Sequence, residues 1–146
     1  MTTIDLETLE LYSGSHSPDG VMCLLEAVSQ YNDEPWSDSP ASVSPVLAAF
    51  GRSWNDGMRS NAERASLKQY IPLLIGTAGN PAADDQRSWM ALDWLVRVHT
   101  VAWLRLAGGS CESHAAALAA LPAIMNSDLA RTAHPTITAA GDAAWT

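Results

Sequence analysis

Apolar residues recur at helical spacing through most of the chain, and this periodicity predicts an all-α protein. The longest such stretch, about 81–106, is long enough for a helix that crosses a small domain. Asn80 suits the N-cap of this helix, and Gly108 suits its end. We therefore expect a compact bundle of about five helices around this central helix, with an extended N-terminal segment.

Local signals place the other helices. Ser44 suits an N-cap, Pro45 a first helical position and Gly57 a C-terminal stop, so a helix is expected over about 45–57. Further helices are expected over about 19–31, 60–71, 111–121 and 123–131.

The last residues are expected to lie outside the bundle. His134-Pro135 breaks the helical pattern, because proline lacks the amide hydrogen that a helix interior requires. The sequence therefore predicts a single helical domain over 1–131. Residues 132–146 are expected to form an Ala-rich segment at which a longer tail could begin.

Helical spacing also predicts which side chains face the core. On the helix over 45–57, the apolar stripe consists of Val46, Leu47, Phe50 and Trp54, and Asn55 is expected to face away from it.

The long helix has two faces of different character. His99 lies near the centre of its apolar arc, so we expect a buried histidine with a hydrogen-bond partner. On the other face, Asp93 and Arg97 stand four residues apart, a spacing that favours an ion pair.

Negative charge is concentrated in the first third of the chain. The formal net charge is −8, yet the first basic residue is Arg52, so residues 1–51 contain acids and no Lys or Arg. A surface that binds the nucleic-acid backbone needs Lys and Arg, which argues against direct nucleic-acid binding through this third. The imbalance favours a protein partner with a basic surface, a bound cation, or simple solubility. The candidate partner-binding residues are Asp19, Glu26, Asp33, Glu34, Trp36 and Asp38.

The expected location is the cytoplasm, with no membrane association. The first residues lack the basic and apolar regions of a secretory signal. Charged residues such as Asp93 and Arg105 interrupt the longest apolar stretch, which excludes a simple membrane span. Cys23 and Cys111 are expected to be free thiols in a reducing compartment.

One cluster suggests chemistry. Cys23 lies near the expected start of a helix, where the helix dipole lowers the pKa of a thiol, and it faces the polar side of that helix. His16 or His99 could act as its base, which makes Cys23 and His99 the candidate catalytic residues. Glu26, one turn later, would oppose thiolate formation. The structural alternative is that Cys23 packs under the preceding loop.

The same residues are candidate metal ligands. His16, Cys23 and Glu26 together have ligand types that zinc accepts. Their spacing matches no standard zinc motif, and a fourth ligand is missing nearby, so no cofactor is expected.

Four blocks of the sequence resemble a group of uncharacterised proteins from bacteria and their phages. They cover about residues 12–107 and read SGSHSPDGVMCLLEAVSQY, SPVLAAFGRSWND, YIPLLIGT and ALDWLVRVHTVAWLRLAG. Members often carry a long tail rich in Ala, Asp and Trp, and GDAAWT at 141–146 resembles its first unit. The resemblance implies a phage or mobile-genome context and gives no activity or ligand.

Two functions remain open. The first is an acidic helical protein-interaction module, in a phage context an inhibitor or modulator of a basic, nucleic-acid-binding host protein. The alternative is a metal- or thiol-dependent enzyme with a site around His16, Cys23, Glu26 and His99.

Overall fold

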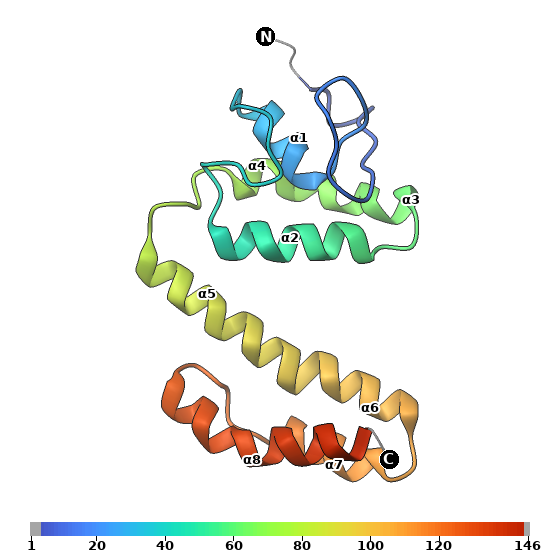
Figure 1. The fold of residues 1–146 in the computed structure, drawn as a ribbon, viewed down its shortest axis with the longest axis vertical. Coiled ribbons are helices and arrows are strands. Elements are labelled where there is room, and N and C mark those ends of the chain that lie inside the picture. The colour runs from blue at the N-terminus through green and yellow to red at the C-terminus, as the bar shows by residue number, and fades with distance from the viewer. Residues whose placement is uncertain (1–3, 145–146) are drawn as a thin grey trace. The chain divides into compact units, whose positions relative to one another are not determined.

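The computed structural model describes residues 4–144 and confirms that the chain is all-α (Figure 1). It divides into two compact units, Met1–Asp84 and Asp85–Thr146. The sequence predicted one domain over 1–131; the division instead falls at residue 84, because each unit has a hydrophobic core of its own. Within the described residues, no helix combines the length and apolarity that crossing a bilayer requires.

The first unit is organised around α1 (Leu24–Tyr31), which packs against α2 (Pro45–Gly57) and α4 (Ile71–Leu74) (Figure 1). Between α2 and α4 the chain forms α3 (Asn61–Arg64) and the 3₁₀ helix η1 (Ala65–Tyr70). The larger core side chains of this unit are Leu11, Leu24, Leu25, Val28, Val43, Leu67 and Ile71.

The first helix is shorter than its sequence pattern suggests. It was expected over 19–31 but begins at Leu24. Met22 forms an isolated parallel bridge with Leu11, and the Tyr12 amide donates to the Met22 carbonyl at 2.9 Å. This pairing and the extended backbone of Cys23 keep Met22 and Cys23 out of the helix, and residues 18–20 before them form a turn, so the helix begins only at Leu24.

The boundaries predicted for α2 are confirmed. Ser44 is its N-cap, where the side-chain hydroxyl accepts a hydrogen bond from the Leu47 amide at 3.4 Å, and Pro45 occupies the first position. Gly57 is the last helical residue.

The buried face predicted for α2 is wrong. Phe50 and Trp54 are 42% and 43% exposed. The buried residues of α2 are instead Ala48, Gly51 and Asn55. The cause is the close approach of α1: a Cβ built on Gly51 would lie 2.9 Å from Leu25 Cδ2, so only a small residue fits there.

The predicted long helix is confirmed as three consecutive segments. These are α5 (Pro81–Trp94), the π-helical η2 (Leu95–Thr100) and α6 (Val101–Ala107). Asn80 caps the start, since its Oδ1 accepts from the Ala83 amide at 3.1 Å. Gly108 ends the helix with φ +68°, a left-handed conformation that glycine adopts without strain.

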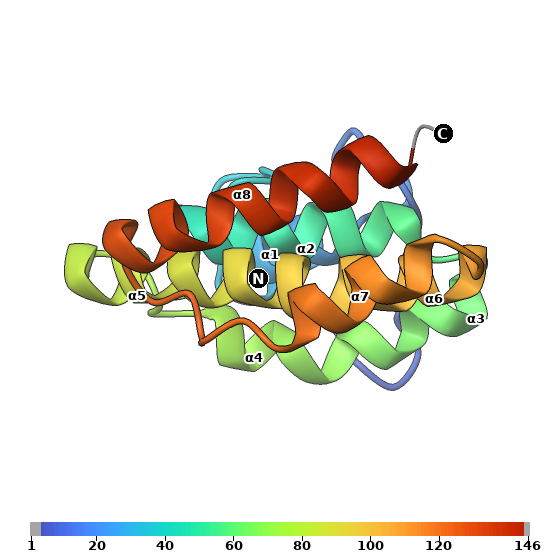
Figure 2. The same cartoon turned by 90° about the horizontal axis from the view of Figure 1, so that it is seen from below.

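In the second unit, α7 (Cys111–Ala119) packs between α6 and α8 (Ser127–Ala144), and Figure 2 shows these helices from below. The predicted Asp93–Arg97 pair is confirmed, with Arg97 Nε donating to Asp93 Oδ1 at 2.6 Å. The same carboxylate accepts from the Ile124 amide at 2.7 Å, and Arg97 Nη1 donates to the Leu121 carbonyl at 3.2 Å. The pair therefore holds the loop between α7 and α8.

The predicted break at Pro135 is wrong, because α8 continues through it. Proline removes one helical hydrogen bond, but Ala133 and Ala140 on either side are buried in the core of the second unit, and Ile137 packs against it. This burial compensates for the lost bond. Most of the predicted Ala-rich segment, 132–146, is thus part of a core helix, and 145–146 lie outside the described residues.

Candidate functional site

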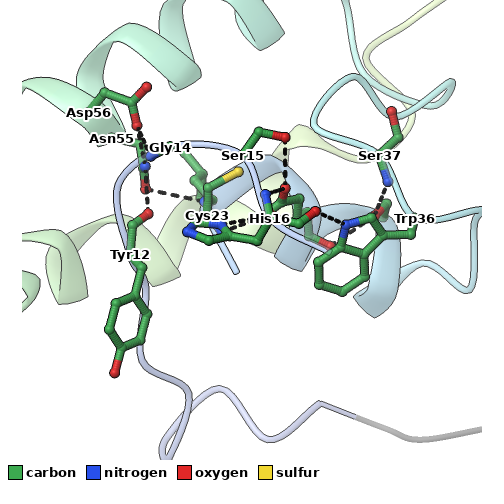
Figure 3. A network of polar contacts seen from close by, with 12 residues as sticks. Tyr12, Gly14, Ser15, His16, Cys23, Trp36, Ser37, Asn55 and Asp56 are labelled. Carbon is green, nitrogen blue, oxygen red and sulfur yellow. Dashed lines mark hydrogen bonds and ion pairs between the residues drawn. The ribbon is translucent and has the colours of Figure 1, made fainter. Parts of the chain in front are cut away.

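The carboxylate of Glu26 is fully buried and accepts hydrogen bonds from three neighbouring residues, Ser15, His16 and Cys23, which Figure 3 labels. Oε1 accepts from the His16 amide at 2.5 Å and from Ser15 Oγ at 3.2 Å. Oε2 accepts from the Cys23 amide at 2.8 Å and lies 2.9 Å from His16 Nδ1. A buried charge is tolerated only when it is compensated in this way.

The start of α1 explains half of this arrangement. Cys23 is the N-cap and Glu26 the third helical residue, so the two form a capping box in which each side chain accepts from the amide of the other. The other half comes from residues 15–16, which lie over this helix end and direct the His16 ring and amide toward the carboxylate.

Hydrogen bonding keeps Glu26 ionised. Burial alone would raise the pKa of Glu26, but the hydrogen bonds from Cys23 and His16 outweigh it and lower the pKa below the ordinary value. Both oxygens are already occupied by donors. Among residues 4–144, no group of three or more His, Cys, Asp or Glu is placed to hold a metal ion, and the candidate set of His16, Cys23 and Glu26 forms a hydrogen-bonded network instead.

The expected activation of Cys23 is wrong in direction. Only 3% of the residue is exposed, and burial raises the pKa of its thiol to about 12 despite amide hydrogen bonds at the start of α1. The neighbouring Glu26 carboxylate raises it further. Because the helix starts at Leu24, Cys23 is not on an exposed polar face but at a covered N-cap. At neutral pH it is a thiol and not a nucleophilic thiolate.

His99 lies in η2 of the second unit, while Cys23 lies in the first. It was expected to be buried on an apolar arc, but it is half-buried between two tryptophan rings. Trp103 Nε1 donates to His99 Nε2 at 3.0 Å, and the ring centroids of Trp94 and His99 are 5.0 Å apart. The described contacts give His99 aromatic neighbours and no acid partner of the kind a catalytic dyad uses.

The candidate partner-binding residues divide by exposure. Asp19 and Asp33 are exposed, and Asp38 is half-buried. Glu26 is fully buried, so its assignment to a partner surface is wrong; the capping box uses its carboxylate. Glu34 is half-buried, and its oxygens accept from Asn32 Nδ2 at 2.6 Å and from the Ser42 amide at 3.2 Å.

Trp36 connects the Glu26 network to the loop after α1. Its indole Nε1 donates to the His16 carbonyl at 2.9 Å, as Figure 3 shows. The adjacent Ser37 amide donates to Ser29 Oγ at 3.3 Å, and Ser29 Oγ donates to the Glu26 carbonyl at 2.8 Å. Segments far apart in the sequence therefore share one polar network.

Asn55 is the residue that pattern analysis missed. It was expected to face away from the core, yet it is fully buried. Its Oδ1 accepts from the Leu24 amide at 3.2 Å, and its Nδ2 donates to the Tyr12 carbonyl at 2.8 Å. Asn55 thus caps α1 from another helix and holds the loop that leads to His16; no local sequence signal indicates such a distant partner.

No family model matches the chain, and neither a curated protein nor a solved structure is significantly similar to it. The resemblance to bacterial and phage proteins therefore stays a prediction.

Proposed function

We propose that the first unit is a binding module for a basic protein surface, and that residues 32–39, the acidic loop, make the contact. The observation that supports this most directly is that hydrogen bonds fix the loop to neighbouring segments while acidic side chains of the loop remain at the surface. Asp33 is exposed, and Asp38 is half-exposed.

Charge supports a basic partner. Residues 1–84 contain eleven acids and four bases, so seven of the eight net negative charges of the chain belong to the first unit. Clustered negative charge of this size attracts Lys- and Arg-rich surfaces and accelerates their association.

The later basic residues do not neutralise the N-terminal acids. Lys68 Nζ donates to the carbonyls of Glu7 and Leu9, each at 3.0 Å. Arg52 Nη1 donates to the Asp38 carbonyl at 2.8 Å. Both cations bind main-chain oxygens of the N-terminal region, and within residues 4–51 no carboxylate forms an ion pair with Lys or Arg.

A third basic side chain, Arg64, also binds main-chain oxygens. Arg64 is buried, and its Nε and Nη2 donate to the carbonyls of Asn55 and Met58, each at 2.7 Å. Its charge is therefore used inside the unit and does not neutralise an acid of residues 4–51.

The acidic loop is ordered before any partner arrives. Glu34 bonds Asn32 and Ser42, Trp36 bonds the His16 carbonyl, and Arg52 bonds the Asp38 carbonyl. Pre-ordering a loop lowers the entropy lost on binding and so strengthens the contact.

Aromatic rings accompany the acids. Tyr31 is 41% exposed at the end of α1, and Trp36 is half-buried within the loop. A guanidinium that pairs with Asp33 or Asp38 can also stack on such a ring, which favours arginine over lysine in the partner.

The test uses an arginine-rich nonapeptide as the basic probe and compares two variants of equal net charge. Asp33→Asn with Asp38→Asn changes the acidic loop; Asp85→Asn with Asp142→Asn changes two exposed acids of the second unit. We expect the loop variant to weaken binding by about fivefold or more and the control by less than about twofold. Equal weakening by both variants would show that only net charge matters and would refute the assignment of the loop.

The enzyme hypothesis has no comparable support. Cys23 is a buried thiol of raised pKa, and His99 belongs to the other unit. An inhibitor or modulator of a nucleic-acid-binding host protein is the form of the binding proposal that the phage resemblance implies.

A further inference from the structure

A pocket of about 460 Å³ opens in the first unit beside the starts of α2 and α5. This volume lies within the range of sites that hold small molecules. The lining is mostly apolar, with Ala41, Val43, Ala48 and three prolines, and its charged members are Arg52 and Asp84. The pocket shares Ser39 with the acidic loop, but none of the carboxylates of that loop lines it.

Arg52 places a fixed positive charge in this pocket. Its Nη1 donates to the Asp38 carbonyl at 2.8 Å and to Ser39 Oγ at 2.9 Å, and these bonds hold the guanidinium in place. In the described part of the chain, its Nε and Nη2 have no protein acceptor. A planar guanidinium whose Nε and Nη2 can still donate hydrogen bonds, among apolar side chains, can bind a carboxylate group through two parallel hydrogen bonds.

Asp84 gives the opposite end of the pocket a negative charge. Its Oδ1 accepts a short hydrogen bond from the hydroxyl of Ser44. Ser44, Ala48 and Arg52 follow one another at intervals of four residues on one side of α2, so the two ends are about 12 Å apart along the helix. A ligand with a second negative charge would meet this carboxylate, which disfavours dianions such as phosphate.

We propose that the pocket binds a monocarboxylate that carries a short apolar body. The carboxylate pairs with Nε and Nη2 of Arg52, and the apolar body contacts Val43, Ala48 and the neighbouring prolines. Small branched-chain acids and the C-terminal residue of a peptide share this chemistry. The proposal does not depend on the binding of a basic partner by the acidic loop.

Two pairs of probes test the proposal by NMR titration of the whole chain. Isovalerate represents a free acid, and N-acetyl-Ala-Val represents a peptide C-terminus; their amides are the neutral controls. We expect at least one acid to bind with millimolar affinity and its amide to bind at least about tenfold more weakly. The acid that binds more tightly identifies the source of the ligand.

Variants locate the binding. Arg52→Gln removes the positive charge and should weaken the binding of the acid probe by about tenfold or more. Ala41 lines the pocket from an exposed position, so Ala41→Leu narrows the pocket and should also weaken the binding of the acid probe. Ala49 is exposed on α2 outside the pocket, so Ala49→Leu should leave this binding unchanged. The comparison of Ala41→Leu with Ala49→Leu still tests the proposal if Arg52→Gln does not fold.

Four results would overturn the proposal. These are no saturation by either acid up to about 20 mM, equal binding of acid and amide, unchanged affinity in Ala41→Leu, and competition by inorganic phosphate.

Discussion

Glu26 and His16 meet through two contacts at once: the carboxylate accepts the His16 amide at 2.5 Å and lies 2.9 Å from the ring Nδ1. The first contact fixes the loop backbone, and the second fixes the ring. Because the His16 carbonyl in turn accepts from Trp36, this pair connects the start of α1 to the acidic loop. The buried carboxylate therefore orders a surface that it does not itself reach.

Replacement of Glu26 by glutamine should destabilise the first unit. The amide nitrogen cannot accept a hydrogen bond, so donors from Cys23 or His16 lose their partner inside the protein. We expect the free energy of unfolding to fall by about 2–4 kcal/mol. Urea denaturation followed by circular dichroism measures the change. Glu7→Gln, at an exposed site, should stay within about 0.5 kcal/mol of the parent.

Acidification should destabilise the protein in a defined direction. Glu26 and Glu34 both have folded pKa values below the ordinary 4.5, because their hydrogen bonds outweigh the effect of burial. The unfolded chain then binds more protons, so the stabilisation is complete above the unfolded pKa and is lost as the pH falls from there through the folded values. Urea midpoints measured between pH 7 and about pH 3 should fall below about pH 4.5. The decline should be shallower in Glu26→Gln, and a rise in stability on acidification would contradict the lowered pKa values.

Cys23 should resist alkylation in the folded protein. With the pKa of its thiol near 12 and only 3% of the residue exposed, its reaction with iodoacetamide at pH 8 should be about a thousandfold slower than in urea. Mass spectrometry of the peptides separates Cys23 from Cys111, which is also buried. Rapid labelling of Cys23 near pH 6 would restore the hypothesis of a reactive thiol.

Two glycines of α2 should respond oppositely to alanine. At Gly51 the new Cβ would lie 2.9 Å from Leu25 Cδ2, and because Leu25 is fully buried, a shift of this methyl group would press on its core neighbours. Overpacking should exceed the gain in helix propensity and destabilise the protein by about 1 kcal/mol. At Gly57 nothing lies within 4 Å, so alanine should be neutral or stabilise by up to about 1 kcal/mol. Thermal unfolding of the two variants compares them, and a stabilised Gly51→Ala would contradict the close packing of α1 on α2.

Interactions between near neighbours in the sequence were predictable. Ser44 caps α2, Asn80 caps α5, and Asp93 pairs with Arg97, as the residue types and spacings indicated. Each of these depends on groups within four residues of one another, so helix geometry alone places them. The all-α class and the long helix follow from the same local periodicity.

Tertiary packing decided what local spacing could not. Whether Cys23 is an activated thiol or a covered N-cap depends on the loop at residues 15–16, which returns over α1. Asn55 is buried because Leu24 and Tyr12, distant in the sequence, supply its partners. Gly51 rather than Phe50 faces inward because α1 approaches closely there.

The sequence by itself therefore determined the all-α class, the long helix, the caps at Ser44 and Asn80, and the excess of negative charge in the first third. Only the tertiary structure decided which acid is buried, where the units divide and which residues line the pocket beside Arg52. The physical reason is the distance along the sequence over which each interaction acts: helix caps and ion pairs within a helix join residues a few positions apart. Burial, desolvation and pocket formation depend on which distant segments exclude water together.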